Sequence, residues 1–389
     1  MIVFEEKWLE GLRKKYPVVS RYTAPFIAKL AFDPVLLDQR NKIEEWFKSL
    51  PDNVKPDICQ RLRSEVSQQH FGAYYEILLY QFLRSLGYSA ALHPELNGFQ
   101  PDLLIMAEDL SNPIIVEVAT IFDDPHWQKE ERKFNLILDE LSKINHYFLI
   151  NVEVESEFIP ENVDYARLNE FVIRWLDSFD PKTTRQLHEI KYKANALYLN
   201  LTMFPLKKSR KSSIIGAHSL PVRWIESIQL RRVLQKKITK YKIAKKLNWP
   251  FLIAVSLTDA PLDKDDIVDE LFGKMTFNIY RDQNGHVVNT KWKLSSNGII
   301  TPKPGLGGKA RNTRLSGVID IKSKWLERAK RSAPAKRAYS FSIIHNPYAS
   351  APLNIKFLKG YPQFIPVAED DKSISMTWID NDSQLTFSC

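Results

Sequence analysis

Two short apolar stretches separated by a few polar residues constrain the fold of this 389-residue chain more than any other feature. The stretches PDLLIMA (101–107) and NPIIVEVAT (112–120) flank the segment EDLS, and this pattern predicts an antiparallel hairpin. A helix is expected before the hairpin over 62–87, where apolar residues recur at helical spacing. Another is expected from Asp123-Asp124-Pro125 to about Ile144, because an acidic cap followed by proline favours a helix start.

The rest of the chain also mixes helices with strands. We expect short helices over 1–60, strands at 146–154, 195–204 and 250–257, and helices at 161–178 and 222–247. Residues 206–220 read as a basic loop, and the last 130 residues look more irregular. This order predicts an α/β protein with a mixed central sheet flanked by helices. Its expected divisions are a helical segment (1–61), a core (62–258) with a strand–helix–strand insertion near 146–205, and a basic C-terminal α+β region (259–389).

Composition excludes several classes of protein. With 44% hydrophobic residues the chain has enough apolar material for a core, which excludes disorder as its main state. Its only cysteines, Cys59 and Cys389, make neither a disulfide framework nor a cysteine-based zinc site. The N-terminus lacks the pattern of a signal peptide, and no apolar run reaches the length of a membrane helix. We therefore expect a soluble cytoplasmic protein without a membrane partner.

Positive charge is concentrated in two segments. The net charge is +9, but residues 206–249 alone carry a balance of +12 and residues 291–338 a balance of +11, so the remainder is acidic. Concentrated cations favour a polyanion, because each neutralised phosphate releases condensed counterions. Either segment alone is typical of a solvated helix face or a basic loop, whereas two together favour nucleic acid.

Three acidic residues interrupt apolar patterns. Glu76 lies within an apolar helical stripe, Asp102 begins an apolar strand directly after Pro101, and Glu117 interrupts the run IIVEVA. Pattern violations of this kind are expected at functional sites. The hairpin places Asp102 nearly opposite Glu117, although the sequence leaves open whether both face the same side. If they do, the paired carboxylates need a cation, and oxygen ligands suit Mg²⁺ or Mn²⁺.

This pattern resembles the PD-(D/E)xK nuclease superfamily, which has the restriction-endonuclease-like fold. Glu76 matches the family's helix acid, Pro101-Asp102 its Pro-Asp, and Glu117 its third acid. The likeness covers residues 65–120 and, more loosely, 222–257. It implies metal-dependent hydrolysis of phosphodiesters, with Asp102, Glu117 and the carbonyl of Val118 holding Mg²⁺ (or Mn²⁺) and Glu76 assisting a metal or water.

The sequence departs from the family at the lysine position, where Ala119 follows Glu117-Val118. That lysine helps to orient the attacking water and to stabilise charge in the transition state. Two replacements are available: Lys129 with Lys133 on the helix after the hairpin, and Lys237 within an apolar stripe of the 222–247 helix. Lys237-x-x-x-Tyr241 resembles a helix motif of some superfamily members. The alternative is that Lys237 belongs to a basic surface helix, with its apolar stem lying along the protein and its ammonium group in water.

The function indicated is a metal-dependent endonuclease acting on double-stranded DNA, with a role in antiviral defence or repair implied by the family alone. The alternatives are a catalytically inactive nucleic-acid-binding module and an interaction protein with an acidic partner. A homo-oligomer or a partner protein, and RNA in place of DNA, stay open. The residues expected to follow the phosphate backbone are Lys207, Lys208, Arg210, Lys211, Arg231, Arg232, Lys236, Lys240, Lys309, Arg311 and Arg314.

Overall fold

The chain forms two compact units, and the first contains the hairpin together with Glu76, Asp102 and Glu117. The computed structural model describes residues 1–106, 110, 112–205, 212–220, 228–240, 247–257, 262–294, 297–302, 309–326, 336–368, 374–379 and 387–388. The first unit comprises Met1–Lys14, Phe26–Phe122 and Ile225–Cys389, and the second comprises Lys15–Pro25 and Asp123–Trp224. Most of the second unit is thus inserted in the first between Phe122 and Ile225.

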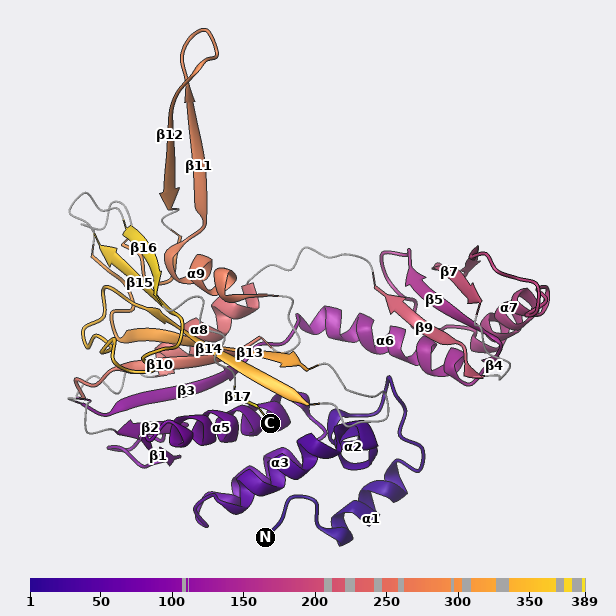
Figure 1. Ribbon diagram of the computed structural model, residues 1–389, viewed down its shortest axis with the longest axis horizontal. Coiled ribbons are helices and arrows are strands. Elements are labelled where there is room, and N and C mark those ends of the chain that lie inside the picture. The colour runs from indigo at the N-terminus through magenta and orange to yellow at the C-terminus, as the bar shows by residue number, and fades with distance from the viewer. Residues whose placement is uncertain are drawn as a thin grey trace. The chain divides into compact units, whose positions relative to one another are not determined.

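A large mixed sheet forms the centre of the first unit (Figure 1). Its strands run in the order β1-β2-β3-β10-β13-β14-β15-β16, and β17 pairs with β14. The bounds are β1 Ser89–Leu92, β2 Leu103–Met106, β3 Ile114–Thr120, β10 Phe251–Ser256, β13 Leu315–Trp325, β14 Arg337–His345, β15 Gln363–Ala368, β16 Ile374–Ile379 and β17 Phe387–Ser388. The pair β2–β3 is antiparallel, whereas β10 runs parallel to both β3 and β13. The mixed sheet predicted for the core is therefore present.

Helices cover both faces of this sheet because successive side chains of a strand point to opposite faces. Val116 and Val118 of β3 belong to the same core cluster as the apolar residues of α5, whereas Ile115 and Ala119 belong to the cluster that contains α8 and α9. Figure 1 shows α5 below the strands, with α8 and α9 above them. The helix bounds are α1 Glu6–Lys15, α2 Phe26–Phe32, α3 Leu37–Lys48, α4 Lys55–Leu62, α5 Ser67–Ser85, α8 Ile228–Lys240 and α9 Lys264–Phe272, with a 3₁₀ turn at Pro34–Leu36.

A two-stranded ribbon leaves the body of the first unit directly after α9. Strands β11 (Met275–Arg281) and β12 (Val287–Leu294) pair antiparallel with each other, and Figure 1 shows the ribbon projecting away from the main sheet. This ribbon was not among the expected strands, although residues 275–279 (MTFNI) alternate apolar and polar types.

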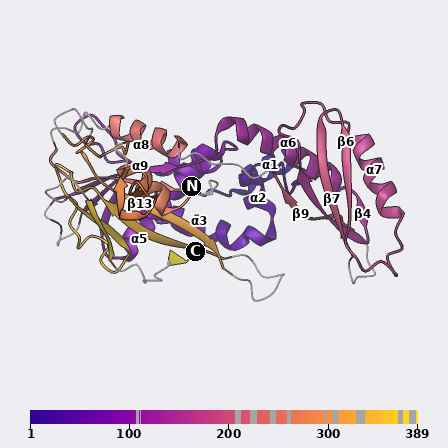
Figure 2. The ribbon, with the colours of Figure 1, turned by 90° about the horizontal axis from the view of Figure 1, so that it is seen from above.

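The second unit has a sheet and a core of its own (Figure 2). Its strands run in the order β6-β7-β5-β9, and β4 pairs with β8 separately. The apolar faces of α6 and α7 pack with residues of β5, β6, β7 and β9 in one cluster. The bounds are α6 Pro125–Ser142, β4 Asn145–His146, β5 Phe148–Val154, α7 Tyr165–Asp177, β6 His188–Ala194, β7 Leu197–Pro205, β8 Ser212–Ser213 and β9 Ile215–Ser219.

Several predicted elements need correction. The helix expected over 62–87 is α5 and begins later, at Ser67, because α4 ends at Leu62 and Val66 has an extended backbone. The loop expected over 206–220 contains β9, which pairs parallel with β5 and buries Ile215. The C-terminal region is more regular than expected, since β13 and β14 extend the same sheet as β10. The expected divisions at residues 61 and 258 stay predictions beside this division into two compact units.

Other predictions agree with the structure. The hairpin of β2 and β3 is present, α6 begins at Pro125 behind an Asp124 cap, and all six residues of β10 are buried. The 222–247 helix is described over Ile228–Lys240, so Tyr241 lies outside the described residues. None of the helices in the described ranges is both long and apolar enough to cross a membrane.

Candidate active site

The hairpin register brings Asp102 and Glu117 together on one face of the sheet. Leu103 pairs with Val116, so the residue before Leu103 lies beside the residue after Val116. The backbone N–H of Asp102 donates to Oε1 of Glu117 at 3.3 Å, and the backbone N–H of Val118 donates to Oδ2 of Asp102 at 2.7 Å. Both carboxylates lie on the sheet face that α8 covers, which answers the question that the sequence left open.

Lys237 of α8 contacts both carboxylates. Its Nζ lies 2.6 Å from Oε2 of Glu117 and 3.2 Å from Oδ2 of Asp102. Lys240, one turn further along α8, approaches the same Glu117 oxygen at 3.4 Å. The side chain of Glu117 is fully buried, while those of Asp102 and Lys237 are 18% and 24% exposed. Two oxygens from adjacent strands thus share one ammonium group at a partly open site.

The local sequence explains why a lysine reaches this point. Leu230, Leu234 and Ile238 are the buried residues of α8, and they pack against Ile115 and Ala119 of β3 in one cluster. Lys237 is three residues after Leu234 and therefore lies on the side of the helix that faces the sheet. Ala119 of β3 places only a methyl group against this helix.

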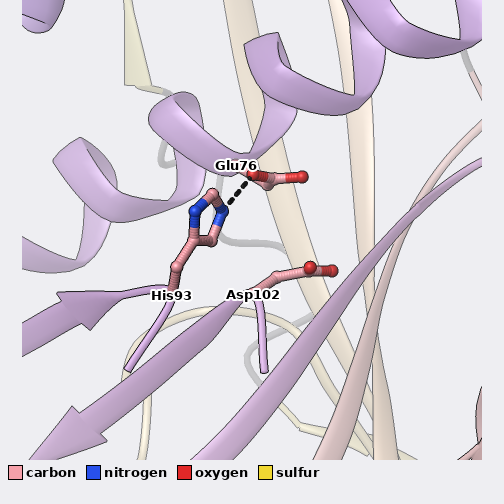
Figure 3. Close-up of side chains that lie close together, drawn as sticks. All are labelled: Glu76, His93 and Asp102. Carbon is pink, nitrogen blue, oxygen red and sulfur yellow. Dashed lines mark hydrogen bonds and ion pairs between the residues drawn. The ribbon is translucent and has the colours of Figure 1, made fainter. Parts of the chain in front are cut away.

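Glu76 contributes a third carboxylate from α5, and its side chain is buried. Both of its oxygens accept hydrogen bonds from Arg61 of α4, at 2.6 Å each, in the bidentate geometry that suits guanidinium and carboxylate. Arg61 also pairs with Asp57 one turn earlier at 2.8 Å. Nε2 of His93 lies 2.8 Å from Oε2 of Glu76 (Figure 3). The helix acid is therefore held by two cationic or polar partners that the sequence pattern did not reveal.

Buried charges at this site shift one another's pKa values. Burial raises the pKa of Asp102 to about 6, with the negative charge of Glu76 and that of Glu117 adding to the effect and Lys237 opposing it. Burial would also raise the pKa of Glu76, but hydrogen bonds from Arg61 and His93 outweigh it and lower that pKa. Burial would lower the pKa of Lys237, yet the charges of Asp102 and Glu117 raise it, so this lysine stays protonated.

The remaining predicted site residues have other partners. Lys129 pairs with Glu161 at 2.7 Å, and Lys133 pairs with Glu130 and with the carbonyl of Ile159, all within the second unit. The amide of Val118 supports Asp102, as described above. These contacts give Lys129 and Lys133 a structural role in their own unit.

The predicted phosphate-binding residues fall into four groups. Lys207, Lys208, Arg210 and Lys211 lie outside the described residues. Arg231 and Arg311 point inward, because Arg231 pairs with Glu270 and Arg311 donates to the carbonyls of Thr301 and Gly298. Burial lowers the pKa of Arg314, which is half-buried. The exposed members are Arg232, Lys236, Lys240 and Lys309.

Sequence reasoning missed Arg61 and His93. Arg61 is part of a polar helix surface, and only the packing of α4 on α5 brings it to Glu76. His93 is a lone histidine between strand β1 and Pro94, with a left-handed backbone at φ 46°. A non-glycine residue in that region is uncommon, but the sequence does not display it.

Comparison with family models, curated proteins and solved structures finds no match for this chain. The interpretation of the site therefore depends on its own geometry.

Proposed function

We propose that this chain is a metal-dependent nuclease of the restriction-endonuclease-like kind that hydrolyses phosphodiester bonds of DNA. One observation carries the proposal: Lys237 Nζ lies 2.6 Å from Glu117 and 3.2 Å from Asp102. The sequence lacks the family's lysine at Ala119, and α8 supplies an ammonium group at the two acids that the missing lysine would accompany.

The donor set suits a divalent cation. Asp102 and Glu117 offer oxygen ligands from adjacent strands, with Glu117 fully buried and Asp102 partly open to solvent. Hard cations such as Mg²⁺ prefer carboxylate and carbonyl oxygens, so these two residues and the Val118 carbonyl would hold the ion. When bound, such an ion activates water and polarises a phosphoryl oxygen.

The chain's own residues would position the reactants. In the hydrolysis a water oxygen bonds to phosphorus as the bond from phosphorus to one ester oxygen breaks, and that oxygen leaves with a proton. The ammonium of Lys237 donates hydrogen bonds and places fixed positive charge where negative charge develops on the phosphoryl oxygens. Arg61 keeps Glu76 ionised and fixed beside the acids, which limits the number of arrangements that the site can adopt.

Duplex DNA is favoured over a small phosphodiester by the charges beside Lys237. Arg232, Lys236 and Lys240 are exposed on the same helix. A helix that carries the reacting lysine on one face and cations on its exposed face would hold a phosphate backbone next to the acids.

The test is cleavage of plasmid DNA with Mg²⁺ or Mn²⁺. We expect cleavage by the wild type and a loss of at least about a hundredfold in Asp102→Asn, Glu117→Gln and Lys237→Met, since removing one charge-stabilising group from an active site typically costs this much. Lys48→Met and Glu45→Gln, which change exposed residues of α3, serve as matched controls that keep full activity. Cleavage that survives Lys237→Met would contradict the role of this lysine.

A catalytically inactive DNA-binding module is the second candidate. It is favoured by the contacts of Lys237 and Lys240 with Glu117, because these ion pairs satisfy the buried charge without any metal. In this case DNA binds with a marked dependence on salt, and neither metal supports cleavage.

A further inference from the structure

Next to the paired acids, three ligand-type side chains converge from three different elements. Glu76 comes from α5, His93 from the loop after β1, and Asp102 from the residue before β2 (Figure 3). One ligand atom from each lies within 4.8 Å of the other two. The cluster combines two carboxylates with an imidazole.

The structure holds these side chains in place before any ligand arrives. Arg61 fixes both oxygens of Glu76 at 2.6 Å. The backbone N–H of His93 donates to the carbonyl of Asp102 at 3.1 Å, and the side chain of Gln100 donates to the carbonyl of His93 at 2.8 Å. The left-handed backbone of His93 turns its ring towards Glu76. Supporting hydrogen bonds of this kind orient the ligands of metal sites.

Carboxylates are concentrated around this cluster. Those of Glu76 and Glu117 are buried and that of Asp102 is half-buried, and the cationic side chains of Arg61, Lys237 and Lys240 pair with them. A divalent ion would add positive charge where these carboxylate oxygens are largely withdrawn from solvent. Nη2 of Arg61 also lies 3.4 Å from Nε2 of His93, so it must withdraw from the imidazole when an ion binds, while Nη1 can keep its hydrogen bond to Oε1 of Glu76.

We propose that Glu76, His93 and Asp102 form a binding site for a divalent transition-metal ion, which this site takes in preference to Mg²⁺. Mg²⁺ favours oxygen ligands alone, whereas imidazole nitrogen is a common ligand of transition metals. In binding, the ion takes the place of the hydrogen bond between His93 and Glu76. The site shares Asp102 with the proposed nuclease centre. The proposal concerns metal binding only, so it is tested independently of DNA cleavage.

The test uses Mn²⁺ as the probe on the full chain. Calorimetry should show tighter binding of Mn²⁺ than of Mg²⁺. Pulsed electron paramagnetic resonance of the Mn²⁺ complex should show coupling to a ¹⁴N nucleus, and labelling the histidines with ¹⁵N should replace that coupling. The variant His93→Asn is chosen because asparagine tolerates a left-handed backbone and offers an oxygen in place of nitrogen.

We expect His93→Asn to lose the nitrogen coupling and to weaken Mn²⁺ binding at least about tenfold, the lower end of what the loss of a supporting residue costs a metal site. His126→Asn, which changes an exposed histidine of α6, should retain both properties. A wild-type Mn²⁺ complex without nitrogen coupling would overturn the assignment even if the variant failed to fold, and so would coupling that persists in His93→Asn. If DNA is not cleaved but the nitrogen coupling is present, only the nuclease proposal is contradicted.

Discussion

At the scale of single residues, buried carboxyl groups dominate the chemistry of the first unit, and Asp320 is one that the proposed reaction does not use. It lies in the middle of β13 at 5% exposure, where the hydroxyl of Ser342 donates a hydrogen bond of 3.4 Å. Burial raises the pKa of Asp320 to about 7, against the opposing charge of Lys322. The folded chain therefore retains a proton there at pH values where the unfolded chain has lost it.

The raised pKa of Asp320 predicts that the stability of the folded chain depends on pH. Because the folded pKa of about 7 exceeds the ordinary 3.8, the contribution of Asp320 to the free energy of unfolding should fall as pH rises from about 4 to about 7, by about 1.4 kcal/mol for each pH unit. Asp320→Asn has no such charge, so its stability relative to the wild type should be greater at pH 8 than at pH 5. Urea unfolding at both pH values measures this, with Glu45→Gln as the exposed control. An equal difference at both pH values would contradict it.

One sequence feature singled out all three of the residues that meet at the paired acids. Asp102, Glu117 and Lys237 each interrupt an apolar pattern, and a charge in such a position needs a partner. The partners of Glu76 were not visible, since Arg61 reaches it only through the packing of two helices. A backbone conformation such as that of His93 leaves no trace in the sequence.

At the scale of elements, α5 and β13 show how the space around a glycine decides its role. Gly72 lies inside α5, and a Cβ there would meet nothing within 4 Å. Gly317 of β13 lies against β14, and its Cβ would approach the carbonyl oxygen of Ile344 to 2.7 Å. Glycine thus weakens the helix but permits close pairing in the sheet.

Opposite effects of alanine follow. Gly72→Ala should raise the free energy of unfolding by about 1 kcal/mol, because alanine is the better helix former. Gly317→Ala should lower it by about 1–3 kcal/mol, since β14 must shift to admit the new methyl group. Thermal and urea unfolding of both variants against the wild type measure the two effects. If Gly317→Ala raised the free energy of unfolding, the prediction would be contradicted, because β14 could then shift to admit the methyl group without a loss of stability.

Element types were predicted correctly at several places where the hydrophobic pattern was clear. The hairpin follows from two apolar runs separated by a polar segment, α6 from a capping signal and β10 from a continuous apolar run. The strand β9 was missed because its last four residues are exposed and only Ile215 is buried, so it carries no period-2 pattern. Its position is determined by pairing with β5, a tertiary contact.

At the scale of the whole molecule, the segregation of charge matters more than the net value of +9. The described part of the first basic segment includes α8, which presents Arg232, Lys236 and Lys240 to solvent while Lys237 faces the acids. The second basic segment differs, because Arg311 and Arg337 direct their guanidinium groups to internal partners. Charge counted from sequence therefore overstates the cations that a polyanion can reach.

The salt dependence of DNA binding tests this view. Each phosphate contact contributes about 0.9 to the slope of log K against log salt concentration, so Arg232→Gln with Lys236→Gln should reduce the magnitude of that slope by about 2. Lys48→Gln, on α3, should leave it unchanged. Titration of a fluorescent DNA duplex at several salt concentrations provides the slopes. An unaltered slope in the double variant would remove α8 from the binding surface.

The insertion of the second unit also orders the events of biosynthesis. Glu117 precedes Lys237 by 120 residues, and β3 must wait for β10, which follows the insertion, to complete its pairing. A nascent chain thus leaves the ribosome with its acids first and its lysine only after the whole second unit has been translated. Any polypeptide truncated within that unit carries the acids without the ammonium group, so a catalytic centre built from these residues would exist only in chains extended through α8.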